Sequence, residues 1–300
     1  MTSPEAAQIG AGQEGWGLRK GLTTSQIKWI ALFFMTLDHL AAYGFEIPLF
    51  GRYYNHLRMV GRIAAPLFLF ALVQGLRHTR SKPRFILRLY LAGMGAGLFV
   101  TVTVLLFGDI VGIITPGNIM FTFFYVALYV WAIERLMGSV KTRNLRAALV
   151  PILCCVLPFV AQTLRLALYE LTPIGSAKVM ISFHCLLDSF LPTFVNADYG
   201  WEMIALGVLM YFAGTKWRQC IFFGGFCLVC IVLTRVFPWG IGGYSSVFVD
   251  SFQCWMVLAL PFMLLYNGRR GNAPKWFFYG YYPIHRYVIS VASAIVQAVS

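Results

Sequence analysis

The sequence predicts an all-α polytopic membrane protein, a bundle of about nine to eleven transmembrane helices with at least one broken or re-entrant segment. Of the 300 residues, 59% are hydrophobic and only 12% are charged, and the mean hydropathy is +0.72. Soluble domains average about 25% charged residues, so this chain has too few polar side chains to cover a water-soluble globule. Its apolar residues also recur in segments of about 20, which is the helix length that crosses a bilayer.

The predicted transmembrane segments follow one another along most of the chain, with Pro, Gly and polar residues between them. They are 26–45, 57–77, 84–107, 117–137, 146–163, 179–196, 200–213, 218–236, 247–266 and 276–298. Residues 1–25 are rich in Gly, Ala and Gln and contain no apolar core of a cleavable signal peptide. We therefore expect 1–25 to be a flexible cytoplasmic tail and 26–300 to be one transmembrane domain that begins with an uncleaved anchor.

Basic residues account for the net charge of +13, and half of the 24 lie around the ends of the second, fourth, seventh and ninth segments. They are Arg77, Arg80, Lys82, Arg84, Lys141, Arg143, Arg146, Lys216, Arg218, Arg269, Arg270 and Lys275. Because cytoplasmic loops collect Lys and Arg, the pattern predicts a membrane protein with its N-terminus in the cytoplasm and its C-terminus outside. The excess positive charge then reflects the orientation of the chain in the membrane, and it does not indicate nucleic-acid binding.

The three apolar segments between positions 146 and 213 lie between two loops that both belong in the cytoplasm. An even number of segments must therefore cross the membrane there. Either one of the three is re-entrant, or a fourth short segment, about Leu164 to Leu171, contributes. Both interpretations put broken helix at membrane depth, where its backbone groups have to be shielded by protein or line a cavity.

The seven cysteines predict neither a metal site nor a disulfide. Cys227 and Cys230 have the spacing of a zinc-binding pair, but they lie in an apolar segment without a second pair or a nearby His. Packing is the simpler interpretation.

Ionisable side chains inside the hydrocarbon layer are costly, so they mark candidate functional residues. The predicted ones are Asp38, His39, Arg62, His184, Asp188, Glu202, Arg235, Asp250, His285 and Arg286. At about 1.5 Å of rise per residue, Asp38 comes within reach of Arg58 and Arg62 on the second segment. His39 is turned about 100° from Asp38 around the helix, and His285 lies at a similar depth. We expect Asp38 to be an anchor and the two histidines to share a cavity.

Tyr282, Pro283 and Arg286 flank His285, and Pro283 is expected to kink the helix there. Each candidate also has a purely structural interpretation. The Asp38–Arg62 pair could simply set helix register, and His39 or His285 could be a packing residue.

The remaining candidates favour a structural interpretation. His184 and Asp188 are four residues apart on one helix face, which favours a structural pair. Pairing or an interfacial position is the simpler interpretation for Glu202, Arg235 and Asp250.

Three stretches of the sequence resemble the TraX family. They are Ile27–Leu32 with Leu37-Asp38-His39; Leu57–Phe70 followed by Gly75–Arg80; and Phe278–His285, which is similar to an aromatic-Tyr-Pro-x-His element. Asp198-Tyr199-Gly200 fits more loosely.

The resemblance implies an acyltransferase of the bacterial cytoplasmic (inner) membrane, related to membrane-bound acyltransferases that use acyl-CoA. It would transfer an acetyl group from acetyl-CoA, without a metal, to the N-terminal amine of pilin during conjugative pilus biogenesis. Its partners would be pilin or another exported protein and the lipid bilayer. The sequence leaves open whether the chain forms a homo-oligomer.

The candidate residues suit that chemistry. Histidine, with an ordinary pKa near 6.5, is a natural general base for an attacking amine, so His39 is the expected base or the nucleophile that carries the acetyl group. His285 is the second candidate base or an oxyanion donor, and Arg62 could stabilise developing negative charge. Asp38 completes the predicted catalytic set. The predicted substrate- and cofactor-binding residues are Arg58, Arg77, Arg84, Arg88 and Tyr282, and CoA phosphates would lie on the cluster formed by Arg77, Arg80, Lys82, Arg84 and Arg88.

Two other functions remain open on the sequence. A proton-coupled transporter or channel could use a relay of Asp38, His39, His184, Asp188 and Asp250. Such folds often contain inverted repeats of interrupted helices, and no such repeat is visible here. A non-catalytic scaffold of the conjugation machinery is the third hypothesis, and for it the basic cluster would reflect topology alone.

Overall fold

The computed structural model describes residues 21–111, 117–171, 177–194, 197–236 and 253–299, and within them the chain is helical without β-strands. The predicted tail 1–25 therefore lies almost wholly outside the described residues. The helices are α1 (Thr24–Tyr43), α2 (Pro48–Arg52), α3 (Tyr54–Gly61), α4 (Ala64–Arg77), α5 (Lys82–Val111), α6 (Ile119–Thr142), α7 (Leu145–Glu170), α8 (Ala177–Phe190), α9 (Gly200–Ala213), α10 (Lys216–Val236), the 3₁₀ helix η2 (Gln253–Ala259), α12 (Leu260–Leu264) and α13 (Lys275–Val299).

The helix lengths and composition confirm an all-α polytopic membrane fold. Five helical stretches are long and apolar enough to cross a bilayer: Tyr54–Arg77, Lys82–Leu106, Ile119–Thr142, Leu145–Glu170 and Lys216–Leu233. Helices α8 and α9 and the η2–α12 stretch are shorter apolar elements. With 20 and 25 residues, α1 and α13 are also long enough to cross. The apolar surface of these two helices is interrupted by polar side chains that belong to the site described below.

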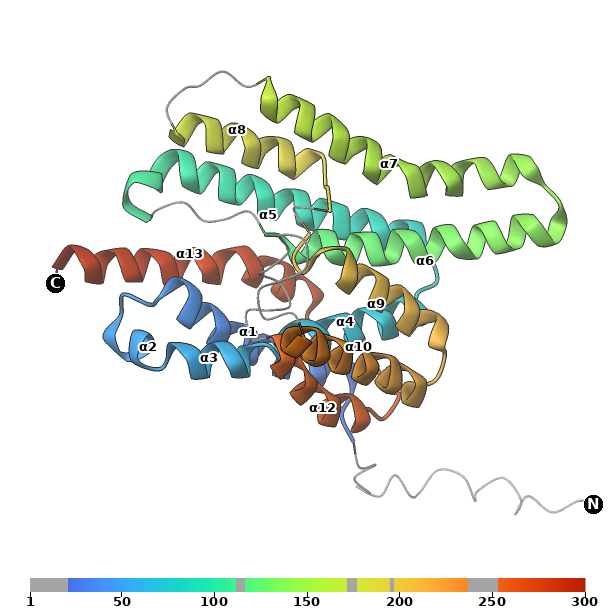
Figure 1. Cartoon of the computed structure of the whole chain (residues 1–300), viewed down its shortest axis with the longest axis horizontal. Coiled ribbons are helices and arrows are strands. Elements are labelled where there is room, and N and C mark those ends of the chain that lie inside the picture. The colour runs from blue at the N-terminus through green and yellow to red at the C-terminus, as the bar shows by residue number, and fades with distance from the viewer. Residues whose placement is uncertain (1–20, 112–116, 172–176, 195–196, 237–252, 300) are drawn as a thin grey trace, which may run out of the picture.

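The helices pack as a bundle whose long members run side by side (Figure 1). Helix α1 contacts α3, α4 and α13, and α5 contacts α6, α8 and α13. The long apolar helix α7 lies against α6, yet only 11% of its span is buried inside the protein. Its exposed Leu and Val side chains suit contact with lipid rather than water.

The region between positions 146 and 213 contains one complete helix followed by one broken helix. Helix α7 is continuous to Glu170, so the separate short segment at Leu164–Leu171 is wrong. That stretch is rich in Leu and Ala and has no Gly or Pro to end the helix. In Figure 1, α7 runs away from the end where it joins α6, while α8 and α9 together run back towards that end. If α8 and α9 are counted as one interrupted span, that span and α7 agree with the predicted even number.

The backbone between α8 and α9 is stabilised by side chains of α6. The hydroxyl of Tyr125 donates to the carbonyl of Pro192 at 2.5 Å, and the hydroxyl of Thr122 donates to the carbonyl of Asp198 at 2.7 Å. Carbonyl groups freed by the break thus have protein partners, which is the condition for irregular backbone at membrane depth. The predicted broken segment is confirmed.

Asp188 pairs with an arginine that lies beyond the predicted segment 146–163 and that was not among the predicted buried charges. Arg165 on α7 donates from Nε to Asp188 Oδ1 at 2.6 Å and from Nη2 to Oδ2 at 3.1 Å. The predicted His184–Asp188 pair is therefore wrong, because a guanidinium matches both carboxylate oxygens and an imidazole cannot. The ring of His184 lies against Tyr169, with ring centroids 4.5 Å apart.

The other predicted buried charges lie apart from this pair. Glu202 is half-buried in the first turn of α9, where a negative charge suits the helix N-terminus. The side chain of Arg235 and all of Asp250 lie outside the described residues. None of the seven cysteines forms a disulfide bond within the described residues.

Replacing Arg165 by Met should strongly destabilise the protein, because it leaves the carboxylate of Asp188 buried without its partner. We expect the free energy of unfolding to fall by about 3–5 kcal/mol, seen as a lower midpoint of thermal unfolding in detergent. Arg165→Met with Asp188→Leu should recover much of the loss. Arg146→Met, the same change at an exposed position of α7, is the control. Equal midpoints for the two Arg→Met variants would contradict a stabilising role for the pair.

Candidate functional site

The candidate site lies where α1, α3 and α13 meet the break between α8 and α9 and the start of α6. The structure brings together there six residues that the sequence singled out: Asp38, His39, Arg58, Arg62, Tyr282 and His285. Most are buried, although the helices that carry them lie at opposite ends of the chain. The two histidines, which were expected to share a cavity, are in direct contact with each other.

The two histidines form a hydrogen-bonded pair whose proton positions follow from their partners. His285 Nδ1 lies 2.7 Å from the carbonyl oxygen of Tyr281, and His285 Nε2 lies 2.6 Å from His39 Nδ1. A carbonyl can only accept, so His285 Nδ1 carries a proton and, in the neutral ring, His285 Nε2 is an acceptor. His39 Nδ1 must then donate. The remaining nitrogen, His39 Nε2, is left with its lone pair.

This lone pair makes His39 the chemically open member of the pair. No described residue donates to His39 Nε2, whereas both nitrogens of His285 are engaged. A second group that orients the first imidazole through its other nitrogen is the arrangement of a general base and its positioning partner. This geometry allows His39 Nε2 to accept a proton while His285 holds the ring of His39 in place.

Neighbouring side chains hold His285 in place. The ring of Tyr281 stacks on it with centroids 4.7 Å apart and an angle of 9° between the planes. Thr36 Oγ1 donates to the carbonyl of Leu32 at 2.9 Å, so the hydroxyl of Tyr281 donates to Thr36 Oγ1 at 2.8 Å. The α13 helix runs through Pro283 as one continuous element, so the predicted kink does not interrupt it.

Asp38 accepts from both candidate arginines. Arg62 Nη2 lies 2.6 Å from Oδ1 and Arg58 Nη1 lies 2.8 Å from Oδ2. Only 9% of the Asp38 side chain and 7% of the Arg62 side chain are exposed. Gly61 allows this close approach, because a Cβ there would lie 2.7 Å from the Cα of Asp38. The predicted anchor is confirmed with two arginines rather than one.

Arg286 makes a second set of contacts that the sequence interpretation had not assigned. Its Nη2 donates to the hydroxyl of Tyr43 at 2.5 Å, and its Nη1 donates to the carbonyl of Gly117 at 3.0 Å. The ring of Tyr43 meets the ring of His39 edge-on, with centroids 5.3 Å apart. Arg286 was predicted to lie inside the membrane beside His285, but no partner was assigned to it. Nothing in the sequence marked Tyr43, because its partners come from distant segments.

The break before α9 supplies two further polar residues. Tyr199 has φ +65° and Gly200 has φ +63°, and the left-handed conformation is unusual for a tyrosine. The turn sends the hydroxyl of Tyr199 towards Arg62 Nη1, at 3.5 Å, while Asp198 Oδ2 accepts from Tyr282 at 3.2 Å. The Asp-Tyr-Gly sequence at 198–200 was the signal that could have found both.

The described site has a positive balance of charge. Arg58, Arg62 and Arg286 outnumber Asp38 and Asp198 by one when the histidines are neutral. Such a low-dielectric, positively charged site favours negative charge that develops on a bound group. The guanidinium of Arg62 already contacts Asp38 and Tyr199. Arg62 therefore stabilises negative charge on a bound group through its electric field and not through a direct hydrogen bond.

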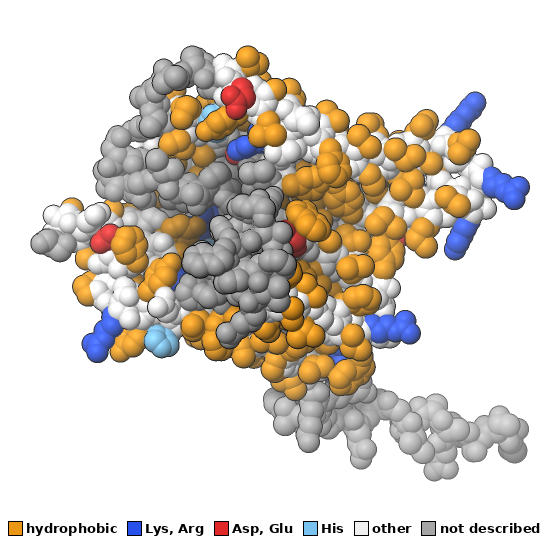
Figure 2. Space-filling model, viewed as in Figure 1, with side chains coloured by type: hydrophobic (Ala, Val, Ile, Leu, Met, Phe, Trp, Pro, Cys, Tyr) orange, Lys and Arg blue, Asp and Glu red, His pale blue; other side chains and the backbone are white. Residues whose placement is uncertain are grey.

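The basic cluster of the sequence lies apart from the histidines. Lys and Arg side chains gather at the end of the bundle where α6 joins α7 and α9 joins α10 (Figure 2). Arg77, Arg80 and Arg84 are exposed, and Arg88 lies over the ring of Phe85 at 5.5 Å. Lys82 differs from these arginines because its side chain has partners within the protein.

Lys82 is not available to a ligand in the way the sequence suggested. It forms an ion pair with Glu134 and donates to the hydroxyl of Tyr211 at 2.7 Å, which ties α5 to α6 and α9. Lys82 therefore joins helices to one another and does not contribute a free charge to the basic cluster.

Fold and site together define a helical integral membrane protein with a histidine pair enclosed by a charged network. The sequence matches the model of the TraX protein family over residues 23–161 and 156–293, and the chain belongs to this family. It is 24% identical over 278 residues to a probable fimbrial assembly protein, FimC of serogroup H1, from Dichelobacter nodosus. That match covers 91% of this chain and 96% of the relative. No solved structure matches.

Asp38→Asn should lower both the stability and the yield of the protein. The amide leaves two arginines, one of them buried, without their countercharge, at an expected cost of about 3–5 kcal/mol. Thermal unfolding of the purified protein measures the effect. Glu46→Gln makes the same chemical change between α1 and α2, where no described residue forms an ion pair with the carboxylate. A loss no greater than that of Glu46→Gln would show that Asp38 is not the anchor.

Proposed function

We propose that this protein is an acyltransferase embedded in the bacterial inner membrane that acetylates the N-terminal amine of pilin, or of another exported protein, from acetyl-CoA. The observation that carries the proposal is the lone pair of His39 Nε2, oriented by His285 inside a positively charged site. Membership of the TraX family supports a role in conjugative pilus biogenesis, and the similarity to a protein named for fimbrial assembly supports it independently.

In the proposed reaction, the amine nitrogen attacks the thioester carbonyl and the carbon–nitrogen bond forms. His39 Nε2 accepts the proton that the nitrogen loses. The carbon–sulfur bond then breaks, and the same proton passes to the departing thiolate, so that free CoA and an amide are the products. His285 acts as a positioning residue that keeps the His39 lone pair directed at the amine.

The charged residues around the pair would stabilise the intermediate. Negative charge develops on the carbonyl oxygen during attack, and the field of Arg286 and Arg62 favours it. The same lone pair could instead attack the thioester directly and carry the acetyl group. Both routes place His39 in contact with the reacting atoms.

The basic end of the bundle suits the phosphates of CoA. Arg77, Arg80 and Arg84 are exposed there, and guanidinium groups pair well with phosphate. Helix α1 begins beside the chain at Arg269 and Arg270. His39 is 15 residues beyond Thr24, so the thioester has to reach about 22 Å into the bundle. With the N-terminus in the cytoplasm, CoA would enter from inside and the exported acceptor from the other side.

A direct transfer assay tests the proposal. Purified protein in nanodiscs is mixed with acetyl-CoA labelled in the acetyl group and a peptide with the N-terminal sequence of pilin. Label should appear on the terminal amine of the peptide, located by mass spectrometry, and a peptide with a blocked N-terminus should stay unlabelled. No transfer with correctly folded protein, and no difference between pilin from cells with and without the gene, would rule out this activity.

Replacing the two histidines one at a time should lower the transfer rate by different amounts. His39→Ala should lower the transfer rate by about 10²–10⁴-fold, the usual contribution of a general base. His285→Ala should lower it less, and the double variant should lose little more than His39→Ala because the two residues act as a unit. His56→Ala, at an exposed histidine, should leave the rate unchanged. Wild-type turnover in folded His39→Ala protein would refute the assignment.

A further inference from the structure

Tyr43 follows His39 by one helical turn on α1 and contacts its ring. Residues four apart lie on the same face of a helix, and the two rings meet edge to face, with centroids 5.3 Å apart and an angle of 72° between the planes. Neither side chain is fully buried. A group bound at the open nitrogen of His39 therefore lies close to Tyr43 as well.

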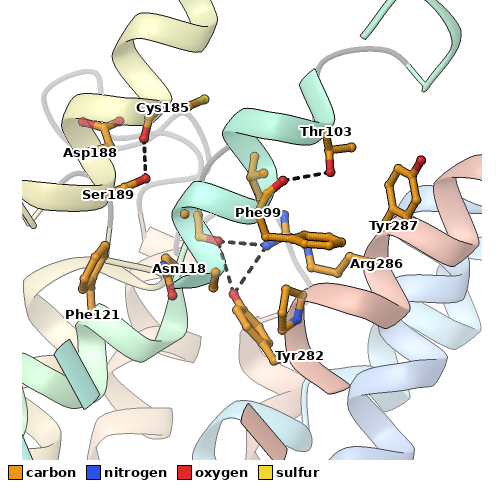
Figure 3. Close-up of a pocket in the computed structure, with 15 residues that line it drawn as sticks. Phe99, Thr103, Asn118, Phe121, Cys185, Asp188, Ser189, Tyr282, Arg286 and Tyr287 are labelled. Carbon is orange, nitrogen blue, oxygen red and sulfur yellow. Dashed lines mark hydrogen bonds between the residues drawn. The ribbon is translucent and has the colours of Figure 1, made fainter. Parts of the chain in front are cut away.

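The hydroxyl oxygen of Tyr43 accepts a hydrogen bond from Arg286. Nη2 of Arg286 lies 2.5 Å from this oxygen, and a guanidinium can only donate. Nη1 of the same side chain donates to the carbonyl of Gly117 at 3.0 Å and to the hydroxyl of Tyr282 at 3.4 Å (Figure 3). Tyr282 in turn donates to Asp198 at 3.2 Å. Arg286 is thus held on several sides, and its contact with Tyr43 does not depend on a ligand.

These contacts leave the hydroxyl proton of Tyr43 directed away from Arg286. A phenol oxygen can accept and donate at the same time, and no described residue accepts the Tyr43 proton. Hydrogen bonds in a chain polarise one another, so donation from the charged guanidinium makes the hydroxyl a stronger donor. Tyr43 therefore presents a strong hydrogen-bond donor beside the lone pair of His39.

The other tyrosines around the histidine pair do not present such a donor. The hydroxyls of Tyr281 and Tyr282 donate to acceptors within the protein, at 2.8 Å and 3.2 Å. Tyr199 accepts from an arginine at 3.5 Å, and within the described part of the chain its ring does not contact His39. The hydroxyl of Tyr43 combines an available proton with contact to the histidine that keeps its lone pair.

We propose that Tyr43 is a catalytic residue whose hydroxyl donates to the carbonyl oxygen of the thioester during acyl transfer. As the carbon–nitrogen bond forms, one electron pair of the carbonyl bond moves to its oxygen, and the hydroxyl of Tyr43 stabilises the resulting charge. The carbonyl then forms again and the carbon–sulfur bond breaks. Tyr43 keeps its proton throughout, while the amine proton passes through His39 to the thiolate. This role rests on the acyl transfer proposed above.

Tyr43→Phe tests the role because it removes the hydroxyl and little else. The ring that contacts His39 and lies 5.0 Å from the guanidinium carbon of Arg286 is kept. In the transfer assay with labelled acetyl-CoA, kcat should fall by about 10²–10³-fold, the usual effect of losing one donor to an oxyanion. KM for acetyl-CoA should stay within about threefold of wild type, because the charge on oxygen develops only in the transition state.

Tyr54→Phe is the matched control on α3. It makes the same chemical change at a tyrosine that is 37% exposed, and both kcat and KM should stay within about twofold of wild type. A hydroxyl that only supports Arg286 predicts a lower midpoint of thermal unfolding for Tyr43→Phe with kcat per folded molecule close to that of Tyr54→Phe. That result would overturn the catalytic role.

A second variant decides the question if Tyr43→Phe does not fold. Fluorotyrosine incorporated in place of Tyr43 keeps the oxygen that accepts from Arg286 and carries a more acidic hydroxyl. At a pH where this hydroxyl stays protonated, kcat should rise by about two- to fivefold, because the strength of the donor follows its acidity. A kcat that is unchanged or lower in the folded variant would argue against donation to the reacting oxygen.

The same assay separates this role from the proposed function. Transfer by the wild-type protein that Tyr43→Phe does not slow would overturn the role of Tyr43 and leave acyl transfer in place. Absence of transfer by correctly folded wild-type protein would refute acyl transfer itself, and the role of Tyr43 with it.

Discussion

The carboxylate of Asp38, held between Arg58 and Arg62, is the contact on which the arrangement of the site depends. It joins α1 to the α3–α4 region, and Gly61 allows the backbones to approach. Because successive residues are turned by about 100° around a helix, directing Asp38 at the arginines directs His39 elsewhere, towards α13. The histidine contact is therefore a geometric consequence of the neighbouring ion pair, in which Asp38 and Arg62 are buried and Arg58 is partly exposed.

The break between α8 and α9 contributes to the same site in a different way. An uninterrupted helix would satisfy its own backbone groups but could not direct Asp198 and Tyr199 to separate partners. The chain instead adopts a left-handed conformation at Tyr199, and α6 side chains bind the freed carbonyls. Local backbone strain of this kind persists only where surrounding contacts hold it, and here those contacts are also the wall of the site.

Much of this structure could be predicted from the sequence because the bilayer imposes strict rules. Apolar length located nearly every helix, and depth along the helices brought Asp38, Arg62, His39 and His285 together. The prediction failed for contacts between distant segments, because the sequence does not show which faces of two helices meet. Arg165 was missed because the α7 segment was ended at residue 163, and this error also produced the wrong His184–Asp188 pair. The contact between Arg286 and Tyr43 joins residues 243 positions apart.

The sequence by itself determined that this is a helical membrane protein, how its apolar segments are spaced, and several of the ionisable residues that lie inside it. Those properties follow from composition and from the cost of burying charge. Only the tertiary structure decided which nitrogen of which histidine keeps a free lone pair. That assignment depends on a carbonyl at Tyr281 and a contact of 2.6 Å between α1 and α13, because the proton position in an imidazole is set by its partners and not by its place in the chain.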